Sequence, residues 1–134
     1  MRVEKEFPAS LDELDNVLAF AEEELEKADC PMKKQMTIAV CLEEIFVNIA
    51  HYAYGGAEGK MLLAIDCADG TAEFRFTDWG VEFDPLKKAD PDITLSAEER
   101  GIGGLGIFMV KKSMDDVRYE RRDGMNVLTL VKAL

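Results

Sequence analysis

Five side chains that could do chemistry or line a site share one stripe of a predicted helix: Thr37, Cys41, Glu44, Asn48 and His51. At about 100° per residue the other faces of this helix are apolar, so a carboxylate, an amide and an imidazole stand together on an apolar cylinder. Glu44 and Asn48 are four residues apart and are neighbours on the helix surface, whereas Glu43 points elsewhere. This pattern alone leaves two interpretations open, a functional site and a polar stripe that faces solvent.

A glycine-rich segment further along the chain could hold an anion. Four glycines fall within residues 101–106, directly before an apolar helical segment. Glycines let the backbone approach a ligand, and amides at a helix N-terminus attract negative charge. We therefore expect phosphate here, with Arg100 as a source of positive charge. The segment is neither a Walker loop nor a dinucleotide fingerprint, since no Lys-Ser/Thr follows it and no strand leads into it. A flexible linker and an exposed arginine remain the alternatives.

A carboxylate also stands at the end of a predicted strand. Asp78-Trp79-Gly80 follows a segment in which apolar and charged residues alternate, 71–77. A partly buried carboxylate that faces a pocket would accept a hydrogen bond from the exocyclic amine of adenine. The alternative is a carboxylate that begins a turn, with Gly80 as the turn residue.

The elements that must position these groups follow from periodicity and turn signals. The capping-box pattern of Ser10 and Glu13 predicts the start of the first helix. Asp69-Gly70 and Asp123-Gly124 each predict a hairpin turn. The expected elements are strand 2–7, helix 11–27, helix 32–52, strands 61–67 and 71–77, a long loop 81–99, helix 107–114, and strands 116–122 and 126–132. This order predicts an α+β fold, a two-layer sandwich in which helices cover one face of a mostly antiparallel β-sheet, and a single domain, 1–134.

Composition narrows the function classes. A formal net charge of -11 and a pI of about 4.5 argue against nucleic acid and against anionic membranes as partners, because both need a basic face. No apolar run approaches the roughly 18 residues of a membrane span, and no signal peptide is recognised. The cysteines at 30, 41 and 67 have neither disulfide-framework nor metal-ligand spacing, and Cys41 and Cys67 are expected in the core. A cytoplasmic location is the expectation.

Three motifs together resemble the GHKL ATPase superfamily, which has the Bergerat ATP-binding fold. Glu44-Ile45-Phe46-Val47-Asn48, continuing to His51-Tyr52-Ala53-Tyr54, is similar to the N box of that family. The segments 78–85 and 101–110 are similar to its first and second glycine boxes. Within the superfamily the chain looks most like the stand-alone bacterial anti-sigma-factor serine/threonine kinases, and the motifs occur in the family's order.

This resemblance implies roles for individual residues. Glu44 would be the general base, and Asn48 would ligate Mg²⁺ through its side-chain oxygen. Asp78 would bind the adenine amine, with Gly80 allowing close approach, and residues 84–100 would form a lid. The nucleotide-binding residues expected from the three motifs are Asn48, His51, Asp78, Gly80, Arg100, Gly101, Gly103, Gly104, Leu105 and Gly106. Two positions depart from the family pattern: Glu82 replaces a usual glycine, and Met125 stands where many relatives have a threonine that supports the adenine site.

The resemblance also implies a function. It indicates a protein kinase that uses ATP and Mg²⁺, binds a sigma factor and holds it inactive, and phosphorylates a serine of an anti-sigma-factor antagonist. It further implies a homodimer, with the first helix and the sheet edge as candidate surfaces. An ATP-binding interaction module without useful kinase activity is the second interpretation, and the presence of Glu44 favours the first. The third is an α+β domain whose glycine loop is structural.

Overall fold

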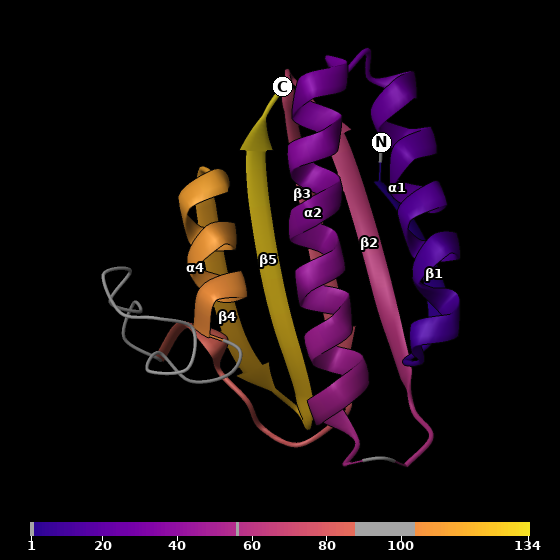
Figure 1. Ribbon diagram of the computed structural model, residues 1–134, viewed down its shortest axis with the longest axis vertical. Helices are drawn as coiled ribbons and strands as arrows, with labels where there is room; N and C mark the ends of the chain where they lie inside the picture. The colour runs from indigo at the N-terminus through magenta and orange to yellow at the C-terminus, as the bar shows by residue number, and fades with distance from the viewer. Residues whose placement is uncertain (1, 56, 88–103) are drawn as a thin grey trace.

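A single five-stranded antiparallel sheet is covered on one face by helices, as expected for an α+β sandwich (Figure 1). The computed structural model describes residues 2–55, 57–87 and 104–134. The strand order is β1-β2-β3-β5-β4, which puts β1 at one edge of the sheet and β4 at the other. The elements are β1 (Arg2–Pro8), α1 (Leu14–Lys27), α2 (Met32–Asn48), β2 (Lys60–Ala68), β3 (Thr71–Asp78), α4 (Gly104–Ser113), β4 (Asp116–Arg122) and β5 (Met125–Ala133), with short helical turns at Leu11–Glu13, Ile49–Ala53 and Pro85–Lys87.

Both predicted Asp-Gly turns close hairpins. Asp69 and Gly70 have φ of 53° and 75°, and Asp123 and Gly124 have φ of 50° and 79°. Positive φ at both central residues matches the right-handed twist of the flanking strands, which is why Asp-Gly is favoured in two-residue turns. The register that results pairs Asp78, the last residue of β3, with Asn126 near the start of β5.

The core lies between the helices and the inner face of the sheet. Its largest fully buried side chains include Phe46 of α2 and Phe74 and Phe76 of β3. Each such side chain contributes about 1.5–3 kcal/mol relative to an exposed position. Cys41 is in this core, as predicted, whereas Cys67 is only half-buried against it. The packing of α2 against the sheet that contains β3 positions the residues discussed below.

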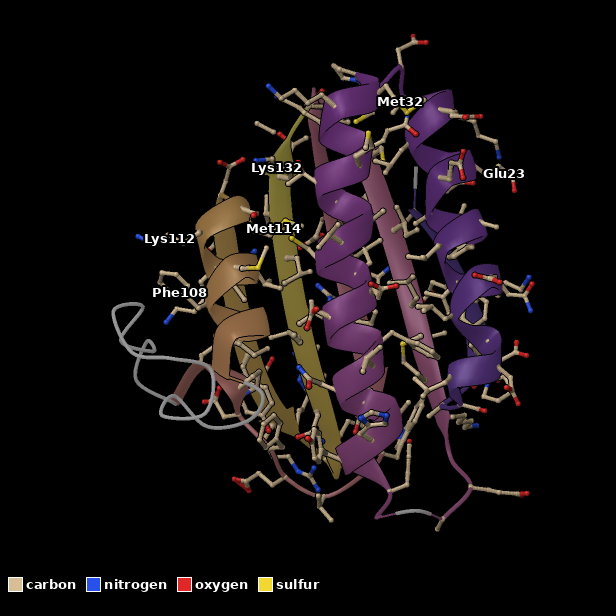
Figure 2. The ribbon with its side chains drawn as sticks, in the orientation of Figure 1. Glu23, Met32, Phe108, Lys112, Met114 and Lys132 are labelled. Carbon is tan, nitrogen blue, oxygen red and sulfur yellow. The ribbon has the colours of Figure 1, made fainter. Side chains whose placement is uncertain are left out.

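The first helix begins differently from the prediction. Ser10 precedes a 3-10 turn, Leu11–Glu13, and its hydroxyl makes no capping hydrogen bond. The α-helix itself begins at Leu14, and the Glu13 carboxylate accepts a hydrogen bond from the Asn16 amide at 3.4 Å instead of reaching back. The predicted capping box is therefore wrong, because a tighter first turn changes the spacing between the two residues. The acidic Glu23 projects from the outer side of α1 (Figure 2).

The second helix is long and apolar. With the turn that follows, Met32–Ala53 is long and apolar enough to cross a membrane by length and composition alone. It is not an unbroken apolar run, because Glu43 and Glu44 interrupt it. Ile38, Leu42 and Ile45 pack into the core against the sheet. The segment therefore has the contacts of a core helix.

Candidate nucleotide site

The first part of the polar stripe, Thr37, Cys41 and Glu44, faces α4. Cys41 is buried, and burial raises the pKa of its thiol. Glu44 is half-buried in an open groove between the two helices. The groove is lined by Thr37, Val40, Cys41, Glu44, Met109, Val110 and Ser113. The solvent-facing interpretation therefore fails for this half of the stripe, although His51 at its end is exposed.

Gly106 explains why α4 can approach Glu44 so closely. A Cβ built at Gly106 would overlap the Glu44 Oε2 atom and lie 2.9 Å from its Cδ. Because Gly106 belongs to the first turn of α4, the carboxylate stands beside amides that have no intrahelical partner. One of the four glycines in 101–106 is thus needed for helix packing at the candidate site.

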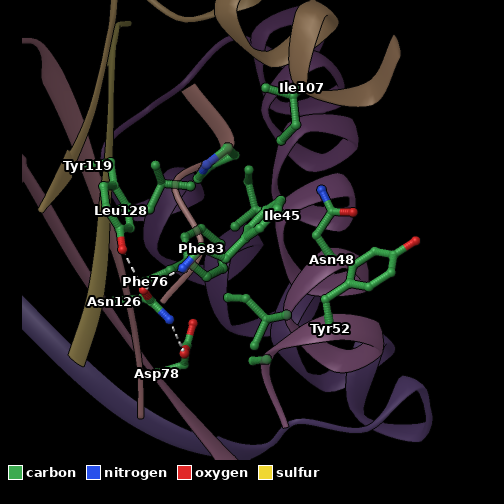
Figure 3. Close-up of a pocket in the computed structure, with 13 residues that line it drawn as sticks. Ile45, Asn48, Tyr52, Phe76, Asp78, Phe83, Ile107, Tyr119, Asn126 and Leu128 are labelled. Atoms are coloured by element: carbon green, nitrogen blue, oxygen red, sulfur yellow. Dashed lines mark hydrogen bonds between the residues drawn. The ribbon is translucent and has the colours of Figure 1, made fainter. Parts of the chain in front are cut away.

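A second hollow lies between α2 and the ends of β3 and β5 (Figure 3). It is a cleft of about 470 Å³, counting the space at its mouth. Its walls are mainly apolar, with a few polar groups at defined places, which is typical of small-molecule sites. The lining residues are Ile45, Asn48, Ile49, Tyr52, Ala53, Phe76, Asp78, Phe83, Pro85, Ile107, Tyr119, Asn126 and Leu128. The structure therefore brings Asn48 and Asp78 to one cleft, while Glu44 lies one helical turn away from Asn48.

Asp78 is buried, with 5% of its surface exposed. Its Oδ1 atom accepts hydrogen bonds from the Gly80 amide and from the Asn126 Nδ2, both at 2.9 Å. Within the described part of the chain, Oδ2 has no hydrogen-bond donor, and Asp78 lines the cleft. The carboxylate is thus oriented by two donors and keeps one oxygen able to accept a hydrogen bond from a ligand.

Asn126 is a site residue that sequence reasoning missed. It is 6% exposed and lies on the inner face of β5, opposite Asp78. The sequence does contain a signal for this residue. In strand β5 the next two inward-facing residues, Leu128 and Leu130, are apolar, so a polar amide at the inward position 126 is unusual. Met125, where the resemblance implies a threonine in many relatives, has no polar group that could support the adenine site. Here the neighbouring residue, Asn126, contacts the Asp78 carboxylate instead.

Aromatic side chains form part of the cleft wall. Tyr52 and Phe83 stack with ring centroids 6.4 Å apart, and both line the cleft. His51 is exposed and packs edge-on against Tyr52 with centroids 6.0 Å apart. His51 is not among the residues that line the cleft, so its contact with a nucleotide stays a prediction.

Several residues of the expected glycine box and lid lie outside the described residues. These are Arg100, Gly101 and Gly103, together with the lid from residue 88 onward. Gly104 and Leu105 begin α4, which starts three residues earlier than predicted. Of the expected lid, the structure describes its first residues, in which Pro85 is buried and lines the cleft.

Gly80 meets protein rather than open space. A Cβ at this position would overlap the Ala53 carbonyl oxygen and lie 2.7 Å from the Ala53 Cβ. The Val81 amide donates to the same carbonyl at 2.8 Å. The missing side chain thus lets the segment after β3 pack on the end of α2, and a close approach of nucleotide at Gly80 stays a prediction.

Gly80→Ala is accordingly expected to lower the free energy of unfolding by about 1–3 kcal/mol, because the new methyl group forces the two segments apart. Urea denaturation of the variant and of the natural protein measures the difference. Unchanged stability would show that the segments at Gly80 and Ala53 can move apart without lowering the free energy of unfolding.

The fold and the site define a class of protein. A model of the histidine kinase-like ATPase domain matches residues 7–132, and the chain belongs to that family. The resemblance inferred from the three motifs is confirmed at this level. The RsbU and RsbW domains of a Mycobacterium tuberculosis protein have a similar fold, with a TM-score of 0.71 and 17% identity over 100% of this chain and 32% of that chain. The histidine kinase AdeS of Acinetobacter baumannii has a TM-score of 0.51 at 12% identity, over 96% of this chain and 67% of its own.

Curated relatives include proteins named as kinases. The serine/threonine-protein kinase BtrW of Bordetella bronchiseptica is 28% identical over 97 residues, which are 72% of this chain and 68% of the relative. The serine-protein kinase RsbW of Bacillus thuringiensis is 29% identical over 93 residues, 66% of this chain and 58% of the relative. The match therefore spans little more than half of the Bacillus protein's length.

Proposed function

We propose that the cleft between α2 and the β3–β5 strands binds Mg-ATP and that the protein transfers the γ-phosphate to a serine of a partner protein. The observation that carries this proposal is the Asp78 carboxylate. It is buried and held by two donors on Oδ1, with Oδ2 left as an acceptor in an apolar cleft. Adenine presents a donor, its exocyclic amine, at the edge where guanine presents a carbonyl oxygen. An acceptor at this place selects adenine.

Asn48 fits the role of a magnesium ligand. Its side chain has no hydrogen-bond partner among the described residues, and it lines the same cleft as Asp78. In the described part of the chain no cluster of three or more His, Cys, Asp or Glu side chains could hold a metal. Mg²⁺ commonly binds through one or two protein oxygens, substrate phosphates and water. The ion would neutralise phosphate charge, while the amides at the start of α4 would hold the phosphate oxygens.

Glu44 is positioned to act as the general base. It lies against Gly106 in the first turn of α4, one helical turn from Asn48. The carboxylate would take the proton of a serine hydroxyl as that oxygen bonds to the γ-phosphorus. The bond from the γ-phosphorus to the bridging oxygen breaks, and ADP leaves with that electron pair.

The surface around Glu44 supports a protein as the phosphate acceptor. Val40 and Met109 line the groove that holds Glu44, and each is 46% exposed. Met36, one turn before Val40 on α2, is 65% exposed. Exposed apolar side chains, methionine above all, are typical of surfaces that contact other proteins. With the resemblance to anti-sigma-factor kinases, this supports an antagonist protein as substrate and a sigma factor as the partner held inactive, in a cytoplasmic homodimer.

Transfer of labelled phosphate from Mg-ATP to the cognate antagonist tests the proposal, with the modified residue identified by mass spectrometry. Phosphoserine on the antagonist supports the kinase. ATP binding without transfer would favour the interaction module, and release of inorganic phosphate alone would indicate water as the acceptor.

A further inference from the structure

We propose that Asn126 is the positioning residue of the base site. Its side-chain amide aligns the Asp78 carboxylate with the bound adenine. The same amide fixes the Val81–Phe83 segment, which contributes to a wall of the cleft. This inference rests on the proposed function and adds the residue that holds Asp78 in the orientation needed to select adenine. Figure 3 shows Tyr119, Asn126 and Asp78 joined by hydrogen bonds beside the cleft.

The orientation of the Asn126 amide is fixed by two backbone groups. The Phe83 N–H, which can only donate, contacts Oδ1 at 3.2 Å, and the Val81 carbonyl, which can only accept, contacts Nδ2 at 2.7 Å. A flipped amide would place donor against donor and acceptor against acceptor. Nδ2 must therefore be the group that faces Asp78, and the carboxylate receives a donor at 2.9 Å.

The Tyr119 hydroxyl reinforces this orientation from the next strand. It donates to Asn126 Oδ1 at 2.5 Å. Burial raises the pKa of the Tyr119 phenol, with the negative charge of Glu82 acting in the same direction, so the hydroxyl keeps its proton at neutral pH. Oδ1 thus has two donors, and both hydrogens of the Asn126 amide are committed, to Asp78 and to Val81.

The arrangement couples two parts of the site. Asp78 would accept a hydrogen bond from the edge of the base. Phe83, which stacks on Tyr52, forms part of the apolar wall of the same cleft. Without the Asn126 donor, Asp78 would keep only the Gly80 amide on Oδ1 and could turn away from the alignment that adenine needs. A loss of alignment lowers affinity for ATP more than affinity for GTP, because adenine presents an amine donor to Oδ2 at the position where guanine presents a carbonyl oxygen.

Asn126→Asp tests the inference with nearly the same side-chain shape. The introduced carboxylate has no donor for Asp78 or for Val81 and repels the charge of Asp78. We expect ATP affinity to fall roughly tenfold to a hundredfold. The preference for ATP over GTP should shrink by a similar factor.

Tyr119→Phe is the milder second variant, since it removes only the hydroxyl. We expect a loss of ATP affinity of roughly three- to tenfold, again with a reduced ATP preference. Asn16→Ala, which removes an exposed amide on α1, is the control and should change neither quantity. Thermal unfolding without nucleotide checks that each variant is folded.

The readout separates a positioning role from a structural one. A residue that only holds the loop would weaken ATP and GTP binding by the same factor, and that result in the folded variants would overturn the inference. Unchanged affinities in both variants would overturn it as well. If the natural protein binds neither nucleotide, the proposed function itself fails. If the natural protein binds ATP and the Asn126 substitution changes nothing, only the role of Asn126 fails.

Discussion

Glu44→Gln is expected to abolish phosphoryl transfer while ATP still binds. The amide has the size of the carboxylate but cannot take up the serine proton. General-base catalysis contributes typically 10²–10⁴-fold, so transfer should fall by about that factor. The effect should appear in the rate constant for transfer, measured in a single turnover with labelled ATP. The loss of a negative charge beside the start of α4 leaves ATP affinity unchanged or raises it.

The adjacent Glu43 provides the matched control. Glu43→Gln makes the same chemical change one residue earlier on α2, where Glu43 does not line the groove that holds Glu44. It should leave both ATP binding and transfer nearly unchanged. Transfer that survives intact in Glu44→Gln would remove Glu44 as the base, and equal losses in both variants would indicate a general effect of helix charge.

Asp78→Asn should remove ATP binding without unfolding the protein. An amide oxygen at the Oδ1 position can still accept from the Gly80 amide and from Asn126. The other atom then becomes an NH₂ group, which meets the exocyclic amine of adenine donor to donor. A site built for one hydrogen-bond polarity rejects the opposite one strongly, and we expect affinity to fall roughly a hundredfold or more.

Asp115→Asn is the control for this change. Asp115 also accepts a hydrogen bond from a backbone amide, that of Ala133 at 2.6 Å, but it does not line the cleft. Calorimetric titration with ATP should therefore separate the two variants, while their thermal unfolding should be similar. Tight ATP binding by a folded Asp78→Asn variant would contradict the assignment of Asp78 to the base.

Local patterns were sufficient to predict most elements of the fold. Alternation gave β3, and Asp-Gly at both turns predicted the hairpins, because these signals act within a few residues. The capping box failed for a local reason, the tighter turn at Leu11–Glu13. The side of α2 that meets α4 could not be predicted from α2 alone, since it depends on a helix more than 50 residues later.

The residues expected at the candidate site are those whose sequence signal lies within one segment. Asp78, Asn48 and Glu44 each belong to a motif that is complete within its own element. Asn126 was missed because its role depends on the pairing of β3 with β5, strands that are far apart in the sequence. The reason for Gly80 was also different from the expectation, because its neighbour Ala53 comes from the end of α2.

Titration of the natural protein with ATP, in the presence and absence of Mg²⁺, tests the central claim most directly. We expect saturable binding of one ATP per chain, tighter with Mg²⁺ than without it and tighter for ATP than for GTP. Absence of ATP binding under both conditions would contradict the assignment of the cleft as a nucleotide site, and with it the proposed kinase.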